Sequence, residues 1–277
     1  MTVSDWQLII DWRALGATQR ELLIGELWCH AIYGIEERDD VAVVGFATEV
    51  AARAAAAAVR ATSRVPSTIV ELVEDTYLDE WRSFARPWQV SGLFVRPSWV
   101  DGVAPPDTIE IVIDPQRSFG SGAHASTRLT LEMMQRLDLT GCTVLDAGCG
   151  SGVLSVAAAV LGAARVDAID IEPEAVAATL ANARRNGVGD RVHARVATVG
   201  GVAEAFDIVL ANVLPSVHRE IAGDLCSRAW RFAIVAGMLD GQVEEVESAY
   251  RATRVALLRE GEWIALCLEI DRADIGA

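Results

Sequence analysis

The chain has 277 residues, of which 52% are hydrophobic, and its formal net charge is −15. This length accommodates one large domain or two smaller ones, and the apolar fraction is sufficient for a full hydrophobic core. The acidic balance argues against direct binding of nucleic acid by a basic surface. It either favours a cationic partner through electrostatic steering or serves only to keep the protein in solution.

The sequence does not have the patterns that are typical of membrane-spanning, secreted or metal-binding proteins. No apolar run reaches the roughly 20 residues that a membrane-spanning helix needs. The N-terminal stretch MTVSDWQLIIDW has an acidic residue ahead of its short apolar run, which is not typical of a secretion signal. The five cysteines are scattered without a C-x-x-C spacing. We therefore expect a cytoplasmic monomer with no metal site and no membrane association.

The first 75 residues predict a small α+β domain. Strand-like runs at 5–12, 41–46 and 67–73 alternate with helical patterns at 18–33 and 49–61. These elements carry no glycine-rich turn and no cluster of reactive side chains. This part of the chain is therefore expected to bind a partner and not to carry out chemistry.

A connecting helix is predicted at residues 74–85, and Arg86-Pro87 ends it because proline disfavours helical geometry in the residue before it. We therefore place a linker helix at 76–90. It separates an N-terminal domain of residues 1–75 from a larger domain of residues 91–277.

Strands and helices alternate through the larger domain. Its expected strands lie at 93–95, 109–113, 143–145, 166–169, 192–196, 206–210 and 232–236, with a closing pair at 254–258 and 263–270. Helices are expected between most of them, including one at 128–137. This alternation predicts an α/β fold with a mainly parallel, Rossmann-like sheet.

The stretch VLDAGCGSGVLSVAAAVLGAARVDAID, residues 144–170, carries the most informative pattern. A strand is followed by glycines at alternate positions (Gly148, Gly150 and Gly152), an alanine-rich helix, and a second strand that ends at Asp170. This is the βαβ unit of a nucleotide-type site, in which the ligand lies outside the carboxyl ends of the strands. Asp170 is then placed to accept hydrogen bonds from both hydroxyls of a ribose.

The spacing of the glycines indicates which class of nucleotide the site binds. A dinucleotide fingerprint reads G-x-G-x-x-G, whereas G-C-G-S-G from Gly148 is one residue tighter. Asp146 precedes the first glycine, and a carboxylate there suits a ligand with a cationic amino-acid end better than a pyrophosphate. The pattern is similar to the first motif of class I methyltransferases, which bind S-adenosylmethionine. Gly148, Gly150 and Asp146 are therefore candidate cofactor-binding residues, although a glycine turn in another α/β domain is the simpler alternative.

Asn212 ends a strand that should lie beside the strand before Gly148. Its amide could accept a hydrogen bond from an incoming amine and orient the lone pair, which makes Asn212 the candidate catalytic residue. Methyltransferases that act on adenine or glutamine carry Asn-Pro-Pro-aromatic at this place, whereas this chain has Asn-Val-Leu-Pro. A planar amide or base is therefore a less expected acceptor. Alternatively, Asn212 only caps the following turn.

Together with the LDAGCGSG motif, two other segments and the tail resemble the ribosomal protein L11 methyltransferase (PrmA) family. The segment DPQRSFGSGAHASTRLTLEMM resembles that family's D-P-G-x-x-F-G-T-G-x-H-x-T-T loop, and DIVLANVL follows the LDAGCGSG motif as it does there. In the tail, AGMLDGQVEEV and REGEWIAL are similar to G-I-L-x-x-Q and G-E-W. The resemblance covers residues 76–270.

The resemblance implies a seven-stranded methyltransferase domain behind an N-terminal substrate-recognition domain. It also implies methyl transfer from S-adenosylmethionine to lysine side chains and to the N-terminal amine of L11 or a similar basic protein. Matched residue by residue, the positions at or near the cofactor are Thr127, Gly148, Asp170, Asn212, Phe119, Gly120 and His124. His124 either takes part in proton transfer or bonds only within its loop.

Other functions remain open at this point. The loop departs from the family pattern at Arg117, Ser118, Ala123 and Ala125, among others, so the acceptor could be a different protein lysine or a small amine. A non-catalytic binding protein that retains the fold and an NAD-dependent enzyme are further alternatives. The sequence specifies neither which amines are methylated nor how often.

Overall fold

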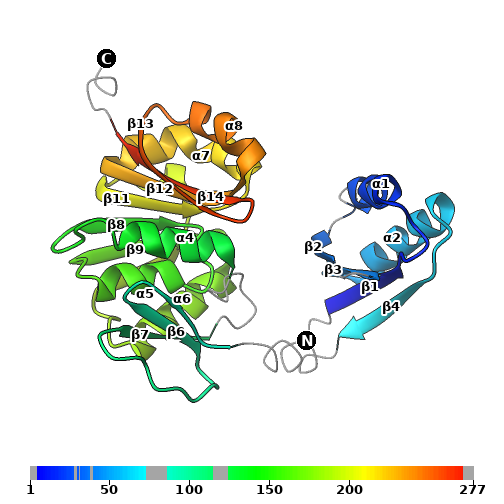
Figure 1. Cartoon of the computed structure of the whole chain (residues 1–277), viewed down its shortest axis with the longest axis horizontal. Helices are drawn as coiled ribbons and strands as arrows, with labels where there is room; N and C mark the ends of the chain where they lie inside the picture. The colour runs from blue at the N-terminus through cyan, green and yellow to red at the C-terminus, as the bar shows by residue number, and fades with distance from the viewer. Residues whose placement is uncertain are drawn as a thin grey trace. The chain divides into compact units, whose positions relative to one another are not determined.

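The computed structural model describes residues 5–27, 30, 32–37, 40–72, 86–114 and 124–270. The chain divides into two compact units, residues 1–84 and 85–277 (Figure 1). The connecting helix predicted at 74–85 lies outside the described residues. Trp88–Val90, at the end of the linker predicted for 76–90, forms strand β5 and not helix.

The smaller unit has the order β-α-β-β-α-β around an antiparallel sheet in which the strands follow each other as β2-β3-β1-β4. Both helices contribute to one core with the alternate residues Leu8 and Ile10 of β1 and with Trp12 directly after it, all of which are buried. Its elements are β1 (Asp5–Asp11), α1 (Ala17–Leu27), β2 (Ile32–Glu37), β3 (Val41–Phe46), α2 (Glu49–Thr62) and β4 (Ser67–Leu72).

One element of this unit differs from the prediction. The helix expected over 18–33 ends at Leu27, and Ile32–Glu37 forms strand β2, which pairs antiparallel with β3. Ile32 and Ile35 both pack against the core. Two apolar residues three positions apart fit a helical period, so the sequence pattern did not reveal the strand.

The larger unit contains a seven-stranded sheet with the order β10-β9-β8-β11-β12-β14-β13. β8, β9, β10, β11 and β12 run parallel, whereas β14 pairs antiparallel with both β12 and β13. The strands are β8 (Thr143–Ala147), β9 (Arg165–Asp170), β10 (Val192–Val196), β11 (Phe206–Asn212), β12 (Ala229–Leu239), β13 (Thr253–Glu260) and β14 (Trp263–Glu269). The α/β class and the mainly parallel sheet are as predicted. Chain order reverses beside β8, which has β9 on one side and β11 on the other, and ligands of such sheets bind at this point.

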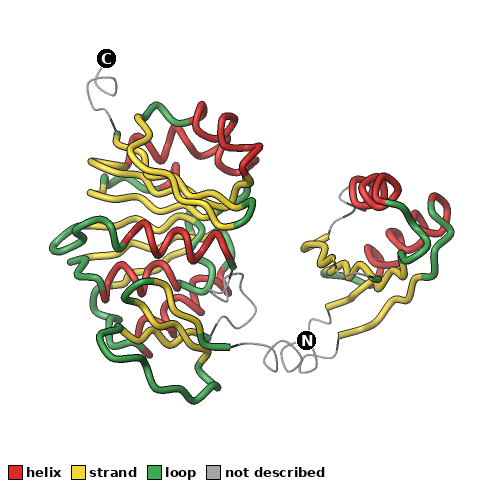
Figure 2. Tube along the Cα trace, in the orientation of Figure 1, coloured by secondary structure: helices red, strands yellow, loops and turns green. Residues whose placement is uncertain are grey.

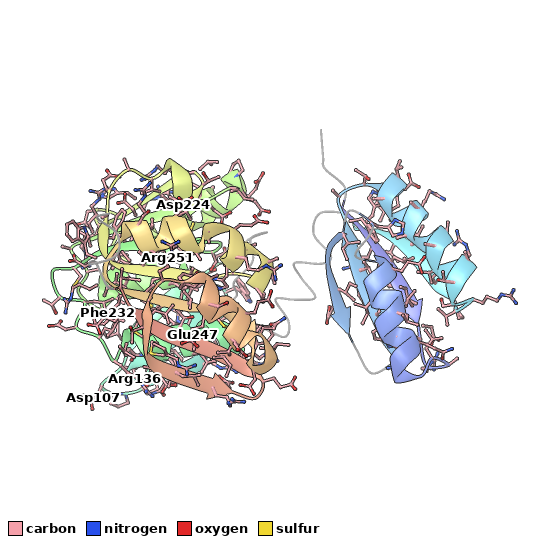
Figure 3. The ribbon with its side chains drawn as sticks, turned by 90° about the horizontal axis from the view of Figure 1, so that it is seen from above. Asp107, Arg136, Asp224, Phe232, Glu247 and Arg251 are labelled. Atoms are coloured by element: carbon pink, nitrogen blue, oxygen red, sulfur yellow. The ribbon has the colours of Figure 1, made fainter. Side chains whose placement is uncertain are left out.

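Helices cover both faces of this sheet (Figure 2). Val144 and Leu210 belong to one apolar cluster with α4, α5 and α6, whereas the adjacent Leu145 and Ala211 belong to a second cluster with α7 and α8. In Figure 3, Arg136, just after α4, and Asp224 of α7 lie to opposite sides of Phe232 in β12. The helices are α4 (Ala125–Met134), α5 (Val153–Val160), α6 (Pro173–Arg185), α7 (Pro215–Arg228) and α8 (Val243–Ala249), with short 3-10 turns at Val199–Gly201 and Asp240–Gln242.

None of the helices within the described ranges combines the length and the apolar character that crossing a membrane requires.

A smaller sheet of three strands packs on the outer side of α4, α5 and α6. It has the order β5-β6-β7 and consists of β5 (Trp88–Val90), β6 (Leu93–Pro97) and β7 (Ile109–Ile113). Two asparagines hold β7 through side-chain hydrogen bonds: Asn182 lies in α6, and Asn186 caps the C-terminus of that helix. Asn186 accepts the Val112 N–H and donates to the Val112 carbonyl, both at 2.8 Å. Asn182 bonds the N–H and the carbonyl of Asp114 at 2.9 and 2.8 Å.

We expect Asn186→Leu to destabilise the larger unit. The substitution leaves the N–H and the carbonyl of Val112 without their side-chain partner, and unmade hydrogen bonds of partly buried groups cost about 2 kcal/mol in total. Urea unfolding measures this loss. Arg184→Leu is the matched control, because Arg184 is exposed on the same helix and should change stability by less than about 0.5 kcal/mol. Equal unfolding midpoints for the two variants would contradict the expectation.

Candidate active site

The glycine turn after β8 folds back over the end of β9. The N–H groups of Gly148 and Cys149 both donate to the Ile169 carbonyl, at 2.9 and 3.0 Å. Gly148, Gly150 and Gly152 have φ values of 78°, 51° and 79°, which only glycine adopts without strain. The turn therefore exposes its backbone next to the end of β9, where the sequence pattern predicts that the ligand lies.

Asp170 ends β9 beside this turn. Its carboxylate accepts the Gly150 N–H at 3.0 Å through Oδ2 and the Glu172 N–H at 3.1 Å through Oδ1. These two bonds fix the orientation of the carboxylate at the carboxyl edge of the sheet. Each oxygen has a second lone pair, so the group can still accept hydrogen bonds from a diol.

Asp146 is buried directly ahead of the turn, with 0% of its surface exposed. Ser155 donates to its Oδ2 at 2.5 Å, while its Oδ1 has no hydrogen-bond partner in the described part of the chain. Burial raises the pKa of Asp146 to about 6. A buried carboxylate with an unpaired oxygen fits the chemistry of a cationic ligand, which would stabilise its charged form.

Asn212 and Thr127 come together from distant parts of the sequence. Asn212 ends β11, and its Nδ2 donates to Thr127 Oγ1 at 3.2 Å. Thr127 lies in the first turn of α4 and is almost completely buried. The bond uses the amide nitrogen, so Asn212 Oδ1 is left as an acceptor for an N–H group of a substrate.

Two glycines bring this pair close to the glycine turn. A Cβ at Gly148 would lie 2.9 Å from Val213 Cγ1, so Val213 packs directly over the turn. Gly237 in β12 has a φ of 94°, and a Cβ there would lie 2.2 Å from the Val213 carbonyl oxygen and 3.1 Å from Asn212 Oδ1. Gly237 is thus needed beside Asn212; the segment AGMLDGQVEEV contains this glycine, but its spacing gave no indication of the contact.

His124 forms the N-cap of α4. Its Nδ1 accepts the Ser126 N–H at 3.3 Å, and its ring lies edge-on to Trp263 with centroids 4.4 Å apart. Burial, and then the nearby Arg128 charge, lower the pKa of His124. A neutral ring whose Nδ1 accepts a hydrogen bond agrees with the second alternative for His124, in which the side chain bonds only within its loop. Phe119 and Gly120 lie outside the described residues.

Asn182 is a site residue that the sequence did not single out. Its Nδ2 donates to the carbonyls of Ser151 and Asp114, both at 2.8 Å. Asn182 therefore links the glycine turn to the end of β7. The spacing N-A-R-R-N, with two amides one helical turn apart, was the available signal. Among the described residues, no group of His, Cys, Asp or Glu side chains is arranged to hold a metal ion.

Comparison with known proteins identifies the family. The sequence profile of the ribosomal protein L11 methyltransferase (PrmA) family matches residues 10–270. This chain belongs to that family. Its members are S-adenosylmethionine-dependent protein methyltransferases of the class I fold, so the predicted family, fold and cofactor are confirmed.

Individual PrmA proteins support the assignment. Ribosomal protein L11 methyltransferase of Aeromonas hydrophila is 40% identical over 185 residues, which are 65% of this chain and 63% of that protein. The enzyme of Methylococcus capsulatus is 41% identical over 203 residues, or 70% and 68% of the two chains. The crystal structure of ribosomal protein L11 methylase from Lactobacillus delbrueckii subsp. bulgaricus matches with a TM-score of 0.61 and 30% identity, over 65% of this chain and 96% of that one.

We expect Gly152→Ala to cost more stability than the same change at Gly187. Both glycines are left-handed, with φ of 79° and 67°, so each alanine introduces about 1 kcal/mol of backbone strain. At Gly152 the new Cβ would also lie 2.8 Å from Thr179 Cα, which adds about 1–3 kcal/mol of overpacking. At Gly187 it would meet no described atom within 4 Å. Urea unfolding compares the two, and equal losses would contradict the packing described.

We expect Asp146 to make the cofactor-free protein less stable as the pH rises from about 4 to about 6. Its pKa in the folded state, about 6, exceeds its ordinary value of 3.8, so the folded state holds the proton more tightly than the unfolded state. The free energy of unfolding then falls by about 2 kcal/mol between pH 4 and 6, and by about 3 kcal/mol over the complete titration, which ends above about pH 7.

Asp146→Asn should remove this fall. Subtracting the variant's pH profile from that of the parent protein cancels the contributions of His124 and His218. Parallel profiles between pH 4 and 7 would show that Asp146 titrates normally.

Proposed function

We propose that this chain transfers methyl groups from S-adenosylmethionine to amino groups of ribosomal protein L11, on lysine side chains and on the N-terminal amine. The observation that carries the proposal is the hydrogen bond between Asn212 and Thr127 at the carboxyl edge of the sheet, beside the glycine turn. The names of its relatives supply the acceptor. The two domain roles, a cytoplasmic location, a monomeric state and the absence of direct nucleic-acid or membrane binding are part of the same proposal.

The residues around the turn would hold the cofactor. The Asp170 carboxylate would accept the ribose hydroxyls, and the backbone of Gly148 and Gly150 would allow close approach of the nucleoside. The unpaired oxygen of Asp146 suits the positive charge at the amino-acid end. Phe119, Gly120 and His124 are proposed to lie near the cofactor because they match the family's loop.

Bound there, S-adenosylmethionine supplies a methyl carbon activated by the sulfonium. Asn212 Oδ1 would accept one N–H of the acceptor amine and direct its lone pair toward that carbon. A free lysine amine has a pKa of about 10.4 and is mostly protonated at neutral pH. Partial desolvation at the site lowers an amine pKa and favours the neutral form that can attack. Alignment of two bound reactants can then supply much of the rate.

The N-terminal unit is proposed to recognise the acceptor. The net charge of −15 would attract a basic ribosomal protein and speed the encounter. This chain contains no lysine, so its own side chains cannot compete as lysine acceptors.

Intact-mass analysis of purified L11 after incubation with the protein and S-adenosylmethionine tests the proposal. We expect L11 to gain mass in steps of one methylene. Asn212→Ala should reduce kcat by about 100-fold or more, because the amine loses its orienting acceptor, while the Kd for the cofactor changes by less than about threefold. Equal losses in both quantities would show that Asn212 acts only as a cofactor ligand.

Matched variants at Thr127 serve as the control. Thr127→Ser keeps the hydroxyl that orients Asn212 and should retain turnover, whereas Thr127→Val keeps the shape and loses the bond. Unchanged L11 mass, with methyl transfer to another protein lysine or a small amine, would indicate a different acceptor. Cofactor binding in calorimetry without turnover on any acceptor would indicate a non-catalytic protein, and binding of NADH in its place would refute the proposal.

A further inference from the structure

His218 and Tyr250 form a buried polar pair behind the candidate active site. His218, in the first turn of α7, has 0% of its surface exposed, and its Nε2 lies 2.8 Å from the Ala236 carbonyl oxygen. Because a carbonyl only accepts, Nε2 carries the proton. Burial lowers the pKa of His218, so the ring is neutral and Nδ1 accepts from the Tyr250 hydroxyl at 2.6 Å.

The Ala236 carbonyl also holds the residue that follows Asn212. It accepts the Val213 N–H at 3.1 Å, and Ala236 is the register partner of Asn212 in the pairing of β11 with β12. One oxygen therefore joins three elements: the end of β11, β12 and α7. His218 provides the only side chain in the described residues with a hydrogen bond to this oxygen.

The backbone next to this oxygen leaves little room for independent movement. The pairing of β12 with β14 is irregular between Ala236 and Met238, where Gly237 adopts its left-handed conformation. A Cβ at Gly237 would lie 2.9 Å from the Val213 carbonyl carbon, so the two segments are in direct contact. A displacement of β12 at this point would move Val213 and, with it, Asn212. Such irregularities are frequent beside active sites, where they aim a side chain.

We propose that His218 is a positioning residue, whose bond to the Ala236 carbonyl fixes the orientation of Asn212 for methyl transfer. The inference rests on the proposed function for Asn212. A histidine with a purely structural role would need only hydrogen-bond partners for its two ring nitrogens in the core. The bond of His218 instead ends on the carbonyl that anchors the backbone next to Asn212, whose side chain donates to Thr127 at 3.2 Å.

Two substitutions of His218 separate positioning from packing. His218→Leu removes the Nε2–H donor and fills the space in the core with an apolar side chain. His218→Gln can instead place an amide N–H at the Ala236 carbonyl. We expect kcat on L11 to fall about tenfold to 100-fold in the leucine variant, since small misplacements of a reacting group have effects of this size. The Kd for S-adenosylmethionine should change by less than about threefold. The glutamine variant should recover most of kcat.

Tyr250→Phe is the control for general destabilisation. It leaves Nδ1 of His218 without its donor but retains the bond from Nε2 to Ala236. We expect it to lower the melting temperature while kcat stays within about threefold of the parent protein. If His218→Leu does not fold, His218→Met replaces it, because methionine also lacks a donor and adapts to irregular space.

The NMR signal of the Asn212 side-chain amide gives a readout that needs no acceptor. The signal is identified by its loss in Asn212→Ala, and it should shift in His218→Leu but not in Tyr250→Phe. An unshifted signal, or a kcat in His218→Leu within twofold of the parent protein, would overturn the inference. Equal kcat losses in His218→Leu and Tyr250→Phe would do the same. If the parent protein leaves L11 unmodified, the proposed function fails, and the amide signal alone decides on His218.

Discussion

One carbonyl at the centre of the larger unit accepts two backbone N–H groups, and the candidate active site depends on this arrangement. Ile169 receives Gly148 and Cys149, which bends the glycine turn over the end of β9. The absence of a side chain at Gly148 then allows Val213 to pack on the turn. Asp170 follows Ile169 and Asn212 precedes Val213, so both are held beside the same turn through their neighbours in sequence. The proposed roles of a ribose acceptor and an amine acceptor are therefore set by backbone geometry before any ligand is present.

Much of the fold could be predicted because periodicity and glycine placement are local signals. The βαβ unit around Gly148 and the strands that end at Asp170 and Asn212 appear where the sequence indicated. The errors arose where tertiary contacts outweigh local preference. Ile32–Glu37 forms a strand because β3 offers it a partner, which no window of sequence shows. Helix α4 begins at Ala125, three residues before the predicted start, because the His124 side chain caps it.

The candidate site was predictable only in its strand-end residues. Asp146, Asp170 and Asn212 stand next to apolar runs, so their positions follow from the strands themselves. The roles of Gly237 and His218 depend on a close approach to Val213 and on the Ala236 carbonyl, 24 and 18 residues away, and local periodicity carries no record of such contacts. The tautomer of His218 is an example, since it is set jointly by a tyrosine after α8 and a carbonyl in β12.

The two asparagines that hold β7 have a consequence for how the protein behaves in a crowded cell. β7 is one of the two outer strands of its sheet, and free N–H and C=O groups on an outer strand can pair with another chain. The amides of Asn182 and Asn186 engage these groups at Asp114 and Val112 as a neighbouring strand would. The helix thus takes the place of a neighbouring strand through two side chains, and the β7 edge is closed at Val112 and Asp114 to pairing with another chain.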